Sequence, residues 1–237
     1  MRFEWAGRSD VGRMRDHNED AFWPPADGAT DDVLTVAVAD GMGGHAGGEI
    51  ASSIALDTAI TVGGDPAVRI QAANLAVIDA ARLRPRLSGM GTTLTLAVLD
   101  PDGDLDIAHV GDSRAYLVRD ETLEQLTQDH SYVADLIAAG KLTPEEADTH
   151  PYRSVLTRAV GLDPAMEVDN YGFVLEPGDR LLLCSDGLTS MLSNQQVSEV
   201  LGDARPPPSA AADELIAAAN EAGGADNITV IVVDITG

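Results

Sequence analysis

Four aspartates in this chain share one local pattern: an apolar run or strand precedes each, and glycine or a small polar residue follows. They are Asp40 in ADG, Asp112 in VGDS, Asp186 in CSDG and Asp226 in GADN. A carboxylate at the end of a buried strand cannot be hydrated cheaply, so it needs a partner. Basic side chains are scarce, because the only lysine is Lys141 and few arginines lie beside these motifs. The four acids therefore predict a cation site.

The donor chemistry favours Mg²⁺ or Mn²⁺ at that site. Carboxylate oxygens are hard ligands, which these two cations prefer. The chain has a single cysteine, Cys184, and no cluster of histidines, so zinc and copper are disfavoured. One aspartate before a glycine is more simply a turn residue. The prediction depends on all four acids together with the run RDHNED at residues 15–20.

Six ordered motifs resemble the metal-dependent protein phosphatase family of the PP2C type. The motifs are R-x-x-N-E-D, A-D-G-M-G-G-H-x-x-G-E, G-M-G-T-T-L, H-V-G-D-S-R, C-S-D-G-L and D-N-I-T-V, spread from about Arg8 to Asp234. The resemblance is greatest to the short bacterial branch that opposes Ser/Thr kinases. It implies a Ser/Thr phosphoprotein phosphatase in which a hydroxide bridging two metals attacks the phosphoryl group of phosphoserine or phosphothreonine.

The resemblance implies a ligand set for these metals, position by position. Asp40 matches the acid that bridges the two metals and is one of the two catalytic residues. The other matched ligands are Gly41 through its backbone carbonyl, Asp186, Asp226, and, largely through water, Glu19 and Asp20. The implied cofactors are two or three Mn²⁺ or Mg²⁺ ions.

Three further positions match roles beside the two metals. Asp112, together with Asp186, matches a ligand of the third metal of bacterial relatives, and Ser154 matches a backbone contact to that metal. Arg15 matches the catalytic arginine that grips the substrate phosphate, for which a planar guanidinium is well shaped. Without the resemblance, an ion pair between Arg15 and the neighbouring acids of residues 16–20 would be the simpler interpretation.

The histidines give no general acid. Met42 stands where eukaryotic members carry a histidine after the Asp-Gly pair, so a histidine acid at that position is excluded. His45 is more simply a helix-start or surface residue. The remaining histidines, His17, His109, His130 and His150, have no catalytic partner evident in the sequence.

Composition excludes several classes of partner. The 237 residues carry a net charge of -24, which argues against nucleic acid and against anionic membrane surfaces. No stretch approaches membrane-spanning length, and one cysteine forms no internal disulfide, so a buried Cys184 and a cytoplasmic location are expected. The implied partners are phosphoproteins, namely Ser/Thr kinases and their substrates, and we expect a monomer.

Alternating strand and helix patterns supply the framework for the acids. Strands are predicted at 33–39, 92–99, 105–110, 115–118, 122–126, 166–174, 180–185 and 228–235. Helices are predicted at 49–60, 66–83, 194–201 and 209–221, the second with Val68, Ala72, Leu75 and Ile78 on one face. Several strands are apolar on both faces, which indicates sheets covered on both sides.

These elements favour an α+β fold. We expect a four-layer α-β-β-α sandwich with two mainly antiparallel sheets flanked by helix pairs, a fold that the resemblance sharpens. Residues 1–237 are expected to form a single PP2C-like domain. Residues 128–150 are a polar excursion, with a helix start at Thr143, and correspond to the flap beside the active site of bacterial relatives.

Three other functions are compatible with parts of the sequence. A catalytically weak phospho-sensing or partner-binding module would be favoured by loss of a metal acid, but Asp40, Asp186 and Asp226 are all present. An aspartyl-phosphate enzyme would need D-x-D and a downstream lysine, which Asp40-Gly41-Met42 and Lys141 do not supply. A purely structural role leaves several strand-end acids without partners.

Overall fold

The computed structural model describes residues 1–43, 47–202 and 205–237, so the prediction for His45 lies outside the described residues. The strands are β1 Arg2–Asp10, β2 Asp20–Trp23, β3 Gly28–Thr30, β4 Leu34–Met42, β5 Gly91–Thr92, β6 Leu94–Leu99, β7 Asp104–Val110, β8 Arg114–Arg119, β9 Thr122–Gln125, β10 Asp169–Val174, β11 Arg180–Cys184 and β12 Ile228–Thr236. The α-helices are α1 Gly47–Thr61, α2 Pro66–Leu83, α3 Tyr132–Ala138, α4 Pro144–Asp148, α5 Asp186–Thr189, α6 Asn194–Gly202 and α7 Pro208–Glu221.

The strands form two antiparallel sheets. The first has the order β3-β1-β12-β11-β8-β9, and the second has the order β10-β7-β6-β4-β2 with β5 paired to β4. All eight predicted strands are present, although the one predicted over 92–99 is divided into β5 and β6, and the one predicted from residue 166 begins at Asp169. Sequence analysis missed β1, β2 and β3. Strand β1 is the neighbour of β12 along its full length, so the omission concerned a central part of the first sheet.

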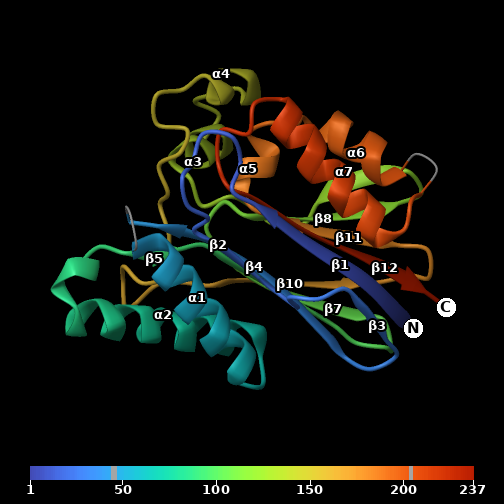
Figure 1. Ribbon diagram of the computed structural model, residues 1–237, viewed down its shortest axis with the longest axis horizontal. Helices are drawn as coiled ribbons and strands as arrows, with labels where there is room; N and C mark the ends of the chain where they lie inside the picture. The colour runs from blue at the N-terminus through green and yellow to red at the C-terminus, as the bar shows by residue number, and fades with distance from the viewer. Residues whose placement is uncertain (44–46, 203–204) are drawn as a thin grey trace.

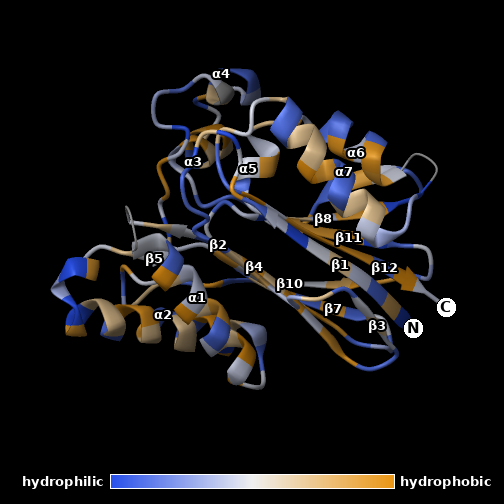
Figure 2. Ribbon diagram, in the orientation of Figure 1, coloured by the Kyte–Doolittle hydropathy of each residue, from blue (hydrophilic) through white to orange (hydrophobic). Residues whose placement is uncertain are grey.

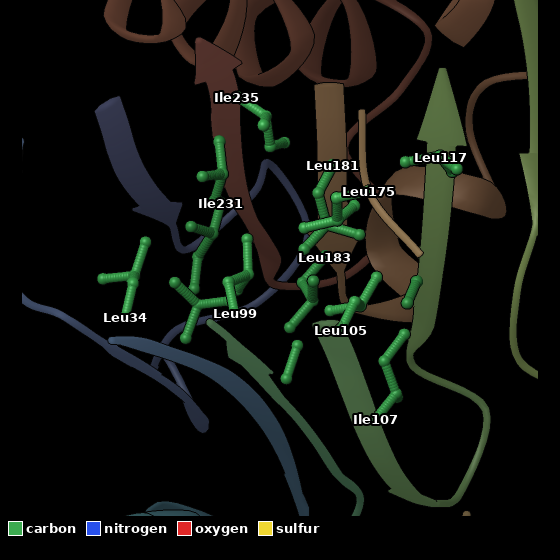
Figure 3. Packing of buried hydrophobic residues seen from close by; sticks show 14 of the residues in the cluster. Leu34, Leu99, Leu105, Ile107, Leu117, Leu175, Leu181, Leu183, Ile231 and Ile235 are labelled. Atoms are coloured by element: carbon green, nitrogen blue, oxygen red, sulfur yellow. The ribbon is translucent and has the colours of Figure 1, made fainter. Parts of the chain in front are cut away.

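The two sheets pack face to face around a cluster of buried apolar side chains. Leu99 and Ile107 reach into this cluster from the second sheet, and Leu181, Leu183 and Ile231 reach into it from the first (Figure 3). All five side chains are almost completely buried. Burial of such area is the main favourable term in folding, and here it fixes how the two sheets are stacked.

Helices cover the outer face of each sheet, so the predicted four-layer α-β-β-α sandwich is confirmed. Helices α1 and α2 lie on the second sheet, and α6 and α7 lie on the first (Figure 1). Figure 2 shows strands that are apolar between the helical layers. Because both faces of strands such as β4, β6, β11 and β12 are buried, their sequences lack a polar alternation.

The predicted buried face of α2 is confirmed at Ile78, which is buried, and is wrong at Val68 and Leu75. Val68 and Leu75 are about half exposed, whereas Ile70, Ala73 and Val77 are buried. Apolar residues occupy most of the circumference of this helix, so periodicity alone did not select the face that meets the sheet. The bounds of the helix are those predicted, since Asp65 caps its first turn and Pro66 occupies the first helical position.

The predicted flap lies between β9 and β10 and contains α3 and α4, at the end of the sandwich opposite the two chain termini (Figure 1). Thr143 starts α4 with a reciprocal capping box to Glu146. Ser131 pairs through an antiparallel bridge with Leu156, which lies beyond the predicted end of the excursion at residue 150. We therefore use the word flap for residues 131–156. No helix of the described residues is long and apolar enough to cross a membrane.

Candidate metal centre

One open cavity of about 470 Å³ gathers nearly all of the predicted site residues. Its lining includes Arg15, Glu19, Asp40, Gly41, Asp112, Ser154, Asp186 and Asp226. The remaining predicted residue, Asp20, is not among the lining residues. These residues are far apart in the sequence, and the fold brings them to one cavity.

The strand ends deliver the acids, as expected from the motifs. Asp40 lies near the end of β4 in the second sheet, and Asp112 follows β7. Asp186 follows β11 as the first residue of α5, and Asp226 precedes β12 in the first sheet. The cavity therefore lies at one end of the sandwich, between the sheets, where neither sheet alone could enclose it.

Asp40 and Asp186 are crowded together and away from water. Asp40 keeps only a small exposed surface, and burial followed by the charges of Asp20, Asp186 and Asp112 raises its pKa well above the usual range. Burial, followed by the charge of Asp226, also raises the pKa of Asp186. Acids that cannot all ionise together are stabilised by cations, which replace their protons.

Asp20 has one fixed oxygen and one without a partner. Its Oδ2 accepts hydrogen bonds from Ser185 Oγ at 2.8 Å and Thr229 Oγ1 at 2.6 Å. Its buried Oδ1 has no hydrogen-bond partner, and neither has the buried Oδ1 of Asp186. Burial raises the pKa of Asp20 to about 6. Unpartnered buried carboxylate oxygens are costly unless a cation contacts them, so the donor set fits hard divalent ions.

Asp112 and Ser154 face the same region of the cavity. Both also line a second cavity of about 650 Å³ beneath the flap, together with Asp186. Burial, followed by the charges of Asp186 and Asp129, raises the pKa of Asp112 to about 8. The structure thus brings the three residues of the predicted third-metal position together.

Arg15 is paired, but not with the neighbours in sequence that were considered. Its Nη2 lies 2.6 Å from Asp226 Oδ2, and both side chains are partly exposed. Among the described residues, no group of three or more His, Cys, Asp or Glu side chains is already arranged to hold a metal ion. One predicted ligand, Asp226, is thus paired with a guanidinium in this structure.

Asn227 is a site residue that sequence analysis missed. Its Nδ2 donates to the backbone carbonyls of Val11 and His17, each at 2.9 Å, and its Oδ1 accepts from the backbone N–H of Glu19 at 2.8 Å. These bonds hold the loop that carries Arg15. The signal was the polar residue after Asp226 in D-N-I-T-V, but its partners lie about two hundred positions away.

Gly41 allows the first turn of α1 to approach the acids. A Cβ at this position would overlap the carbonyl oxygen of Gly48, so only glycine fits. The backbone N–H of Gly41 donates to Glu19 O at 3.2 Å. Burial also raises the pKa of Glu19.

Comparison with known proteins gives a consistent family. A family model described as Protein phosphatase 2C matches residues 13–217. The Ser/Thr protein phosphatase PstP of Mycobacterium tuberculosis is 40% identical over 98% of this chain, and this chain spans 45% of that relative's length. The Ser/Thr phosphatase Stp of Listeria welshimeri is 39% identical, over 96% of this chain and 94% of its own.

Solved structures agree with the sequence relatives. The crystal structure of M. tuberculosis PstP/Ppp has a TM-score of 0.90 and 38% identity, with both chains covered fully. A structure of the PstP catalytic domain in complex with two manganese ions has a TM-score of 0.87 and 36% identity, covering 100% of this chain and 99% of that one.

Proposed function

The chain belongs to the protein phosphatase 2C family, and on that premise we propose that it is a metal-dependent Ser/Thr phosphoprotein phosphatase. The observation that carries the proposal is the meeting of Asp40, Asp186 and Asp226 at one cavity. Buried oxygens of Asp20 and Asp186 lack partners there. The PstP catalytic domain that was solved with two manganese ions supports the same ligand chemistry for this chain.

The chain's own residues have distinct roles in this proposal. Asp40, Gly41, Asp186 and Asp226 would hold two Mn²⁺ or Mg²⁺ ions, with Glu19 and Asp20 holding the second through water. The cations would lower the pKa of a nearby water and neutralise the phosphate oxygens. Asp112 and Ser154 would hold a third.

Arg15 would bind the substrate phosphate. For this role it must leave Asp226, which it contacts at 2.6 Å in the structure. The exchange is balanced, because Asp226 gains a cation and Arg15 gains an anion with two acceptor oxygens. The Arg15 guanidinium is half exposed and lines the cavity, so it can contact either Asp226 or a phosphate bound in the cavity.

The finer parts of the proposal concern partners and organisation. We propose phosphoproteins as substrates, in particular Ser/Thr kinases and their targets, with a monomeric chain acting in the cytoplasm. We also propose that residues 1–237 form one domain in which the flap selects substrate. The relatives named as Ser/Thr phosphatases support the substrate class, and the position of Ser154 in the cavity lining supports the role of the flap.

Hydrolysis of a phosphothreonine peptide by the purified chain tests the proposal. Phosphate release is measured with Mn²⁺, with Mg²⁺ and with excess EDTA, for the wild type and for Asp186→Ala. We expect release that requires metal and that falls by at least about a thousandfold in the variant, as for loss of a central catalytic element. No release with either metal from folded protein would instead favour a phospho-binding module.

A further inference from the structure

A buried histidine outside the predicted ligand set contacts the turn that carries Asp112. His130 is 3% exposed and is the residue immediately before the flap. Sequence analysis gave it no partner. In the structure its backbone and its ring contact three separate segments, and none of these contacts is used in the proposed reaction.

The first segment is the Gly111–Asp112 turn. The backbone N–H of His130 donates to Gly111 O at 2.7 Å, and the backbone N–H of Gly111 donates to His130 Nδ1 at 3.1 Å. This reciprocal pair of hydrogen bonds engages both the backbone N–H and the backbone carbonyl of Gly111, the residue that precedes Asp112. Because Nδ1 accepts, the neutral ring carries its proton on Nε2.

Gly111 has little freedom to adopt another position. Its φ is +116°, and a Cβ there would approach Thr93 Cβ to 2.5 Å. His109 Nε2 lies 3.0 Å from Gly111 O, and His109 Nδ1 lies 2.8 Å from Thr95 Oγ1. The carbonyl of Gly111 therefore accepts from two histidines, and the turn is held on more than one side.

The second segment is the returning end of the flap. The backbone N–H of Thr157 donates to His130 O at 2.9 Å, next to the bridge between Ser131 and Leu156. The third is β10, where Asp169 Oδ2 lies 3.2 Å from His130 Nε2. Asp169 is itself held by Arg158, at 2.5 Å from Nη1. The Nε2–H is not aligned for a hydrogen bond, so this contact is an electrostatic one.

We propose that His130 is a positioning residue that fastens both ends of the flap to the Gly111–Asp112 turn, and so sets where the Asp112 carboxylate lies. The inference rests on the proposed function only in taking Asp112 as a metal ligand. Residues that orient metal ligands commonly change metal affinity by about 10–100-fold when they are replaced. Replacing His130 should therefore change the affinity of the metal-binding step that involves Asp112, and leave the affinities of the other metal-binding steps unchanged.

Two conservative variants of His130 test the contacts of its two ring nitrogens, Nδ1 and Nε2, separately. In His130→Asn the amide oxygen takes the place of Nδ1 and can still accept from Gly111. In His130→Gln the amide lies nearer the place of Nε2, so the acceptor for Gly111 is lost. The matched control is Asn74→Ala, because Asn74 is 2% exposed and likewise binds a loop, accepting from Gly161 N at 2.6 Å.

The experiment measures the binding of Mn²⁺ alone to the full chain, by electron paramagnetic resonance of the free ion. The Asp112→Ala variant identifies which binding step of the isotherm involves this aspartate. We expect His130→Gln to weaken that step by about 10–100-fold. His130→Asn and Asn74→Ala should each stay within about twofold of the wild type. We also expect His130→Gln to raise the Mn²⁺ midpoint for hydrolysis without changing kcat at saturation.

Three results would overturn the inference: a wild-type isotherm for His130→Gln, equal weakening in His130→Asn and His130→Gln, or an isotherm that Asp112→Ala leaves unchanged. Because the isotherm needs no substrate, it decides the role of His130 even if the wild type hydrolyses nothing. Conversely, if the wild type hydrolyses the peptide while His130→Gln has an unchanged Mn²⁺ isotherm, the proposed function stands. That result would reject only the role of His130.

Discussion

At the scale of single residues, Asn227 has the clearest supporting role. Replacing it with alanine removes three hydrogen bonds to the loop of residues 11–19. We expect Asn227→Ala to lower the free energy of unfolding by about 2–4 kcal/mol, at roughly 1 kcal/mol for each bond. The value of kcat/KM should fall as well, because the same loop carries Arg15. Urea unfolding and phosphopeptide kinetics measure the two effects.

Asn170→Ala is the control for that variant, because Asn170 is exposed on β10. It should change the free energy of unfolding by no more than about 0.5 kcal/mol. If the two alanine variants behave alike in both measurements, the loop does not depend on Asn227.

His109 gives a dependence on pH that can be assigned to one residue. Burial, followed by the charge of His130, lowers the pKa of His109 from 6.5 to about 3. The folded state therefore favours the neutral ring. The stability that this provides is complete above the unfolded pKa, and it is lost as the pH falls from about 6.5 towards 3.

His109→Gln keeps a donor for Gly111 but cannot titrate. Between about pH 7 and pH 5 the wild type should lose about 2 kcal/mol more unfolding free energy than this variant does. Urea unfolding of both proteins at several pH values measures this difference in unfolding free energy. The titration of other groups contributes equally to both proteins and therefore cancels. Parallel curves for the two proteins would show that His109 does not carry a lowered pKa.

Which residues could be predicted depended on how local their signal was. Asp40, Asp112, Asp186 and Asp226 each carry the strand-aspartate-turn pattern within four residues. The pairing of Arg15 with Asp226 and the loop contacts of Asn227 carry no such local signal, because each joins a loop to the start of β12, some two hundred positions away. Distant pairing of this kind becomes visible only when the sheets are assembled.

At the scale of elements, strands with continuous apolar runs were predicted well, and strands with mixed composition were not. β11 and β12 are buried on both faces along most of their length. β1 contains charged residues at both ends and is only partly buried, so its sequence does not alternate cleanly. The face of α2 was predicted only in part for the opposite reason, since this helix is apolar around most of its surface.

Two glycines at helix ends should respond in opposite directions to alanine. A Cβ at Gly187, in α5, would overlap the carbonyl oxygen of Asn227, whereas a Cβ at Gly202, in α6, would meet nothing within 4 Å. We expect Gly187→Ala to lower the free energy of unfolding by about 1–3 kcal/mol. Gly202→Ala should raise it by about 0.5 kcal/mol, because alanine costs less chain entropy on folding.

Thermal and urea unfolding of these two variants provide the comparison. An unchanged stability for Gly187→Ala would mean that α5 can move away from Asn227 at little cost. In that case the start of α5, and with it Asp186, would not be fixed by close packing.

At the scale of the whole molecule, the site depends on both sheets. β4 of the second sheet brings Asp40, and the ends of β11 and β12 in the first sheet bring Asp186 and Asp226. The apolar cluster between the sheets sets their separation (Figure 3). Metal binding and sheet packing should therefore stabilise one another, as expected when a ligand binds only the folded state.

The net charge of -24 belongs to the same scale. Part of it is gathered at the cavity, where burial raises the pKa of Asp20, Asp40, Asp112 and Asp186. Composition alone could not say how much of the excess was gathered in this way. The stacking of the two sheets decides it.

The central claim is that this cavity holds divalent cations between the two sheets. Anomalous diffraction from crystals grown with Mn²⁺ tests it most directly. The account predicts at least two manganese peaks in the cavity, one of them contacting Asp40 and Asp186, with Arg15 released from Asp226. Crystals that hold Mn²⁺ elsewhere, or nowhere, while the pair of Arg15 and Asp226 persists, would contradict it.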